Sequence, residues 1–148
     1  MPEDSSLKIE TIFHANVHVV WKAWTAPLII LKWFGSDPNG SGVSAKMDVR
    51  RGGAFEISFR NSDQTEFTCS GVYFEVIEYQ NLNFTWSWKN EPGVESSVFV
   101  SFTPTENGVL MKFEHANFGN SSGHDYEKGW RATFVKLARV LAEMQSDV

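Results

Sequence analysis

The sequence predicts an α+β protein in which an antiparallel β-sheet covers one long helix at the C-terminal end. Apolar and polar residues alternate along several successive segments, which is the period of half-buried strands. Over residues 124–145 the apolar residues instead recur at helical spacing and form one stripe. The stripe consists of Tyr126, Trp130, Phe134, Leu137, Ala138 and Leu141. A sheet and a helix that share one apolar interface form a layered α+β arrangement.

The first part of the chain predicts one strand and two short helices. Residues 7–13 alternate between apolar and polar side chains, as a strand does. Asn16 is a suitable N-cap for a helix whose apolar residues fall on one face over 17–24. A second short helix is expected over 28–34, where Gly35 can end it.

Six further strands are expected after a Gly- and Asn-rich loop. Clusters of Gly, Asn, Asp and Pro separate segments of strand character, and their short spacing favours antiparallel connections. The expected strands are 43–49, 54–60, 66–77, 81–88, 94–104 and 108–116. Such a sheet must curve strongly to wrap a helix, and Gly53 and Gly71 stand where bends could supply the curvature.

Length and charge limit the possible functions. The 148 residues fit one domain, expected over residues 7–146 after a disordered acidic tail at 1–6. Lys and Arg number 13 against 18 Asp and Glu, so the net charge of −5 makes nucleic acid an unsuitable partner. No apolar run approaches the roughly 20 residues of a membrane span. We therefore expect a cytoplasmic protein without a membrane span.

No pattern in the sequence calls for a cofactor. The single cysteine, Cys69, excludes an internal disulfide framework and the Cys-rich zinc classes. His14 and His18 do not form a metal pair, because an N-cap at Asn16 would leave His14 outside the helix. We expect neither a metal nor a nucleotide or flavin.

The candidate binding residues are the side chains expected to face the helix. With 12 Phe, 6 Trp and 3 Tyr, the inner surface is bulky in aromatic rings, as the lining of small-molecule pockets often is. The candidates are Trp33, Phe55, Ile57, Phe59, Trp86, Trp88, Met111, Phe113, His115, Tyr126, Trp130 and Phe134. Two alternatives remain open: the rings line a cavity that takes a ligand, or they fill the interior completely.

Two roles are possible for His115. It shares a strand face with Met111 and Phe113, so we expect it to be buried and neutral. A neutral imidazole has one donor and one acceptor, which could contact a ligand or could be paired within the core.

Several motifs, taken in order, resemble a known family. They are Val20-Trp21-Lys22-Ala23-Trp24-Thr25, Lys32-Trp33-Phe34, Arg51-Gly52-Gly53-Ala54-Phe55, Gly71 with Glu75-Val76, Leu82-Asn83-Phe84-Thr85-Trp86, His115 and Gly129-Trp130. This order is similar to that of the START-like, or birch-pollen-allergen-like, helix-grip superfamily. Within it, the chain most resembles the family of the activator of heat-shock protein 90 ATPase homologue.

The resemblance implies a seven-stranded sheet that grips the C-terminal helix, often around an internal cavity. Superfamily members commonly bind lipids, sterols or polyketides there. The first functional hypothesis is therefore binding of a hydrophobic, ring-containing small molecule or lipid. The resemblance also implies two alternatives: a co-chaperone that stimulates the heat-shock protein 90 ATPase, and a polyketide cyclase or dehydratase. We regard an enzyme as the least favoured, because few titratable groups face the expected cavity.

Overall fold

A curved antiparallel sheet and three helices make up the part of the chain that the computed structural model describes, residues 6–117 and 125–146. The elements are β1 (Ser6–Phe13), α1 (Val17–Thr25), α2 (Pro27–Ile30), β2 (Ser41–Met47), β3 (Ala54–Arg60), β4 (Glu66–Ile77), β5 (Asn81–Trp88), β6 (Ser96–Thr105), β7 (Gly108–Ala116) and α3 (Tyr126–Ser146). The predicted α+β class is confirmed. Of the expected tail, residues 1–5 lie outside the described residues, and Ser6 belongs to β1.

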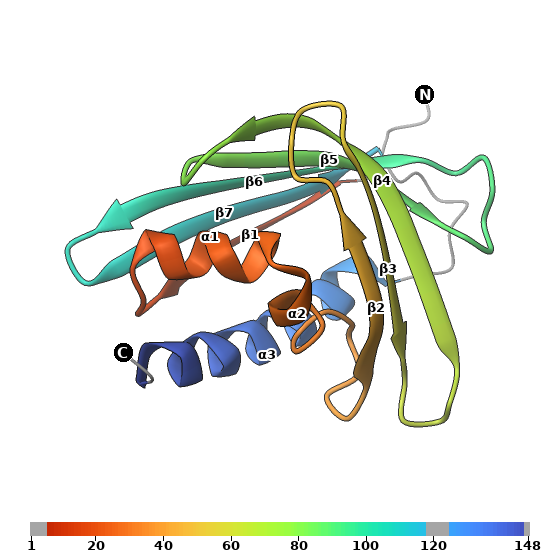
Figure 1. Cartoon of the computed structure of the whole chain (residues 1–148), viewed down its shortest axis with the longest axis horizontal. Helices are drawn as coiled ribbons and strands as arrows, with labels where there is room; N and C mark the ends of the chain where they lie inside the picture. The colour runs from red at the N-terminus through yellow and green to blue at the C-terminus, as the bar shows by residue number, and fades with distance from the viewer. Residues whose placement is uncertain (1–5, 118–124, 147–148) are drawn as a thin grey trace.

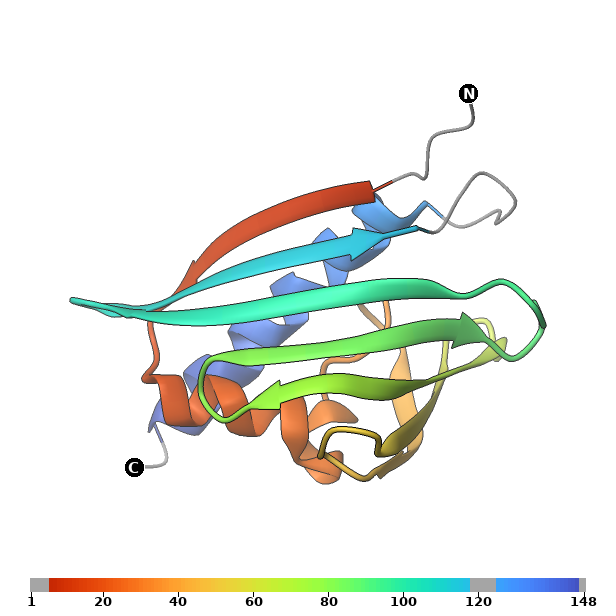
Figure 2. The same ribbon diagram turned by 90° about the horizontal axis from the view of Figure 1, so that it is seen from above.

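The sheet arches over the helices, which all lie on its concave side (Figure 1). Its strand order is β1-β7-β6-β5-β4-β3-β2, and every neighbouring pair is antiparallel. Figure 2 shows α3 crossing beneath the strands, with its C-terminal end beside α1. At the other end of α3, β2 and β3 turn away from the rest of the sheet and form a side wall (Figure 1).

Strand β4 turns the corner between the two parts of the sheet. Residues 66–72 of this strand pair with β3, and pairing with β5 runs from Cys69 to Ile77, with a register shift between Tyr73 and Glu75 that forms a bulge. At Gly71 the chain comes so close to β5 that an added Cβ would lie 1.9 Å from the carbonyl oxygen of Thr85. This close approach explains why position 71 needs a glycine, while the bulge itself lies at Tyr73–Glu75, just beyond it.

The second short helix is shorter than predicted. Helix α2 ends at Ile30, and turns over residues 31–33 replace the helix expected to continue to residue 34. The carbonyl of Leu31 accepts a hydrogen bond of 3.2 Å from Gly42, where β2 begins. The carbonyl of Leu31 is thus bonded to β2, whereas in a continuing helix it would accept a hydrogen bond from an N–H one turn further along. Gly35, with a φ of 108°, then redirects the chain as expected.

The predicted stripe of the long helix is correct except at one position. Tyr126, Trp130, Phe134 and Leu137 are buried, whereas Ala138 is exposed. Two polar residues of α3 are buried instead, and they are Thr133 and Lys136. Alanine has a small side chain that fits either face of a helix, so its presence in the pattern carried little information.

The first prediction concerns the close approach of β4 and β5 at Gly71. Gly71→Ala should lower the free energy of unfolding by roughly 2 kcal/mol or more, because a new Cβ forces two strand backbones apart. Urea denaturation followed by circular dichroism measures the loss. Ser70→Ala, on the same strand, is the control and should stay within about 0.5 kcal/mol of the parent protein. Equal stability of the two variants would contradict this account of the close approach.

Candidate functional site

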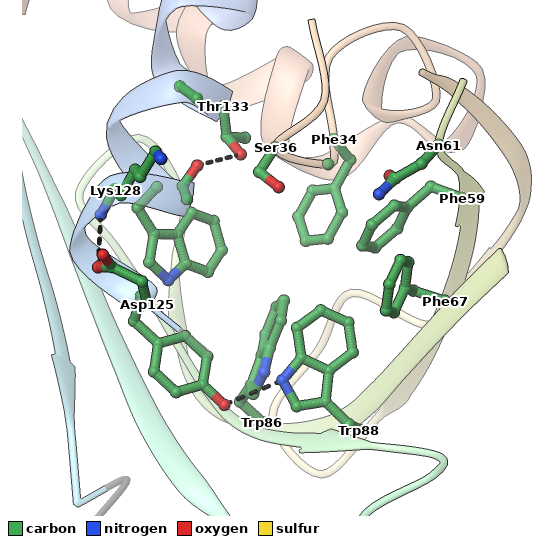
Figure 3. A pocket seen from close by; sticks show the side chains of 15 residues that line it. Phe34, Ser36, Phe59, Asn61, Phe67, Trp86, Trp88, Asp125, Lys128 and Thr133 are labelled. Carbon is green, nitrogen blue, oxygen red and sulfur yellow. Dashed lines mark hydrogen bonds between the residues drawn. The ribbon is translucent and has the colours of Figure 1, made fainter. Parts of the chain in front are cut away.

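A pocket of about 320 Å³ opens at the N-terminal end of α3. It lies between the first turns of this helix, the β3–β4 hairpin, β5 and the segment that follows α2. Its lining consists of Phe34, Gly35, Ser36, Phe59, Asn61, Phe67, Trp86, Trp88, Asp125, Tyr126, Lys128, Gly129, Trp130, Ala132 and Thr133. Figure 3 shows aromatic rings surrounding the hollow, with polar side chains toward its edge.

The aromatic walls of the pocket are packed against one another. Trp86 meets Trp88 with ring centroids 5.2 Å apart and Trp130 at the same separation. On the opposite side, Phe59 stacks on Phe67 at 5.8 Å. Aromatic pairs at such distances are each worth about 0.5–1.5 kcal/mol beyond the area they bury. The walls are therefore held in place by their own contacts, without a ligand.

Small residues on α3 leave the space open. Gly129, Ala132 and Thr133 follow one another at helical spacing and face the pocket. Thr133 Oγ1 donates a hydrogen bond of 2.8 Å to the carbonyl of Gly129. Among the described residues, a Cβ added at Gly129 would meet only Ser36, at an ordinary contact distance of 3.7 Å. The hollow thus exists because this helical face carries almost no side-chain volume.

Two hydrogen bonds fix the start of α3 at the edge of the pocket. Asp125 Oδ1 accepts a hydrogen bond of 3.1 Å from the backbone N–H of Lys128, as a helix cap does. The indole N–H of Trp88 donates to the hydroxyl of Tyr126 over 2.9 Å and joins β5 to the helix (Figure 3). The first contact caps the helix, and the second sets the position of the helix end relative to the sheet.

His115 lies behind the pocket and is fully buried. Its Nδ1 accepts a hydrogen bond of 3.0 Å from the indole of Trp130, so the ring proton must sit on Nε2. This Nε2 donates to Ser96 Oγ over 2.7 Å, and Ser96 Oγ donates to the carbonyl of Trp86. Burial lowers the pKa of His115 from 6.5 to about 3. The histidine is therefore neutral, and both of its nitrogens are engaged within the core.

A buried lysine holds the loop that closes the pocket from one side. Lys136 Nζ donates to the carbonyls of Gly35 and Asp37 over 3.1 and 2.9 Å. Burial lowers the pKa of Lys136, although the nearby Asp37 opposes this shift.

The Asp37 carboxylate in turn accepts hydrogen bonds from the N–H and hydroxyl of Ser62. Hydrogen bonds from the backbone of Ser62 and Asn39 lower the pKa of Asp37. Helix α3, the loop and the β3–β4 hairpin are thus linked.

The structure separates the predicted binding residues into three groups. Phe59, Trp86, Trp88, Tyr126 and Trp130 line the pocket. Phe55 and Ile57 border a void of only about 10 Å³ deeper in the core, beside Trp24 and Phe34. The others line neither space and pack within the core; they are Trp33, Met111, Phe113, His115 and Phe134. The interior is consequently filled over most of its length and hollow at one end.

The sequence analysis missed other residues that line the pocket. Phe67 could have been found, because it alternates with the inward-facing Cys69 along β4. The small residues of α3 also leave a signal, since Gly129, Ala132 and Thr133 interrupt a stripe of large apolar residues. Ser36 and Asn61 belong to loops and carry no periodicity that could have revealed them.

The fold and the sequence both identify the family. A helix-grip arrangement with this strand order defines a class of α+β proteins, and residues 14–142 match the family described as Activator of Hsp90 ATPase homolog 1-like protein. The chain belongs to this family. None of the proteins with curated descriptions is similar enough in sequence to count as a match. In the described part of the chain, no helix combines the length and apolar character needed to cross a membrane.

Solved structures share the fold over almost the whole chain. A protein from Rhizobium leguminosarum is 19% identical with a TM-score of 0.82, and the match covers 97% of both chains. An AHSA1-like protein from Aeromonas hydrophila is 18% identical with a TM-score of 0.81, covering 95% of this chain and 94% of that one. CalU16 from Micromonospora echinospora is 26% identical with a TM-score of 0.70, covering 94% and 78%. These similarities show the helix-grip fold.

The second prediction follows from the lowered pKa of His115. Below about pH 6.5 the unfolded chain protonates this histidine while the folded protein does not, so unfolding is favoured as the pH falls. The contribution is about 1.4 kcal/mol per pH unit until the pH nears the folded pKa of about 3. His115→Gln lacks this titration. Urea denaturation between about pH 7 and 4.5 should therefore show the parent protein losing its advantage over the variant. Parallel pH profiles would rule out this role.

The third prediction concerns Gly129. Gly129→Ala should raise the free energy of unfolding by about 0.5–1 kcal/mol, because alanine is the better helix former. Within the part of the chain that the structure describes, the added methyl group would contact only Ser36, at an ordinary distance. Thermal unfolding by calorimetry measures the gain. A destabilised variant would mean that the helix face is closer to the loop than the structure shows.

Proposed function

We propose that this protein binds a hydrophobic, ring-containing small molecule in the pocket at the N-terminal end of α3. The observation that carries the proposal is a ring-walled hollow of about 320 Å³ in an otherwise filled interior. Ligand sites in proteins begin at about 300 Å³ and are lined mostly by apolar and aromatic side chains with a few polar groups. The pocket has this size and composition.

The shape of the walls supports a flat ligand. Trp88 stands on one side of the hollow, and Phe59 and Phe67 form another (Figure 3). Trp130 also lines the hollow. Aromatic surfaces contact a planar ring over a large area at low entropic cost. Polar side chains such as Asn61 and Lys128 stand toward the edge, where a polar substituent of the ligand would remain near water.

Binding is favoured over acid–base catalysis at this site. A general acid or base must lie within hydrogen-bond reach of the substrate. His115 does not line the pocket, and its two nitrogens bond to Trp130 and Ser96. Asp125 lines the pocket, but its carboxylate caps α3. These arrangements support a structural use of both groups.

Membership of the family favours one alternative function, which is stimulation of the Hsp90 ATPase. An ATPase assay with purified Hsp90 distinguishes this function from small-molecule binding. If the protein stimulates the ATPase equally well with and without a bulky substitution in the pocket, the co-chaperone function is favoured over small-molecule binding.

The fourth prediction fills the pocket from the helix side. Ala132→Phe should abolish binding of ring compounds such as fluorene and flavone, because the new ring occupies the space beside Gly129. Ala138→Phe is the matched control, since Ala138 is exposed on the same helix and does not line the pocket. A thermal-shift assay measures binding, because a ligand raises stability by RT ln(1 + [L]/Kd).

Two results would count against the proposal. One is an unchanged melting temperature of the parent protein with every ring compound tested. The other is equal binding by Ala132→Phe and Ala138→Phe.

A further inference from the structure

Two polar side chains at the edge of the pocket make no hydrogen bond to another residue that the structure describes. They belong to Ser36, in the loop after α2, and to Asn61, in the β3–β4 hairpin, and both residues line the pocket. Figure 3 shows them at the same edge of the hollow, with the hydroxyl and the amide directed toward it. Ser36 is exposed and Asn61 is half-buried, so a molecule that enters the pocket can reach both.

A hydrogen-bonded pair of neighbours holds the two residues beside each other. Asp37 directly follows Ser36 in the loop. Ser62 directly follows Asn61 in the hairpin. The Asp37 carboxylate accepts hydrogen bonds of 2.8 and 2.9 Å from the N–H and the hydroxyl of Ser62. The backbone N–H of Asn61 donates to the carbonyl of Thr65 over 2.8 Å and fixes the turn of the hairpin. Both polar residues are therefore in place before a ligand arrives.

Lys136 fixes the loop from the helix side. Its Nζ donates to the carbonyls on either side of Ser36, over 3.1 Å to Gly35 and over 2.9 Å to Asp37. The backbone of the loop is thus held on both sides of the serine. Groups that are held in the bound position lose little freedom when a ligand arrives, and this lowers the cost of binding.

The charges around this edge of the pocket compensate one another. Lys136 and Asp37, which hold the loop, have opposite signs. The two charged residues among the described lining residues, Asp125 and Lys128, also have opposite signs. A charged substituent would lose hydration here without gaining an uncompensated counter-ion, which is unfavourable. The site therefore suits a neutral polar substituent.

We propose that Ser36 and Asn61 bind a hydroxyl group on the ring compound, so that the ligand is a flat, neutral molecule of the phenol type. This inference rests on the proposed function of the pocket and assigns the polar end of its ligand. A serine hydroxyl and an asparagine amide each contain a donor and an acceptor. A ligand hydroxyl also donates and accepts, so its chemistry is complementary to both side chains. The aromatic walls hold the ring, and the polar pair sets its orientation.

Three probes with one ring skeleton test the proposal. Fluorene has no polar group, 2-hydroxyfluorene has one hydroxyl and fluorene-2-carboxylate has one negative charge. A hydroxyl that met only apolar walls would weaken binding, because it would leave water without gaining a partner. We expect the parent protein to bind 2-hydroxyfluorene roughly three- to tenfold more tightly than fluorene, the usual range for one neutral hydrogen bond. Fluorene-2-carboxylate should have no such advantage. Isothermal titration calorimetry measures the three affinities.

A double variant removes both polar groups with little change in side-chain size. Ser36→Ala/Asn61→Leu should bind 2-hydroxyfluorene no more tightly than fluorene, and its affinity for fluorene should match that of the parent protein. The matched control is Ser44→Ala/Asn90→Leu, which makes the same substitutions at exposed positions that do not line the pocket. This control should keep the preference for 2-hydroxyfluorene. Should the double variant fail to fold, the affinities of the parent protein for the three probes decide the question.

The outcomes separate this inference from the proposed function. Equal affinity of the parent protein for fluorene and 2-hydroxyfluorene would overturn the inference and leave the pocket a ligand site. A preference for 2-hydroxyfluorene that persists in the double variant would also overturn it. Tightest binding of fluorene-2-carboxylate would do the same, since it would assign the polar end of the ligand to a cation such as Lys128. Failure of all three probes to bind would overturn the proposed function and the inference together.

Discussion

The hydrogen bond from the Trp130 indole to His115 is the contact on which the geometry of the site depends. It joins α3 to β7, and the remaining hydrogen bonds of His115 and Ser96 continue through β6 to the carbonyl of Trp86 on β5. Burial keeps the imidazole neutral, so this chain places no unpaired charge in the core. Because the helix and three strands are held together there, two of the pocket-lining tryptophans keep a fixed relation to each other.

The balance between a filled and a hollow interior is set by residue size along α3. Toward the C-terminal end, Phe134, Leu137 and Leu141 meet the rings of α1 and the sheet, and the space is occupied. At the N-terminal end, Gly129 and Ala132 offer almost no volume to the same concave surface. The aromatic residues therefore have two roles. Toward the C-terminal end of α3 they fill the core, and at its N-terminal end they line the pocket.

Sequence periodicity predicts the elements well and the site only partly. Alternation along strands such as β3 and β5 identifies inward-facing residues, because each strand has just two faces. Periodicity cannot say which inward residue borders a hollow, since that depends on loop residues such as Ser36 that meet the helix through tertiary contacts. The burial of Lys136 is hidden for the same reason: lysine is normally exposed, and only the folded loop brings two carbonyls to its ammonium group.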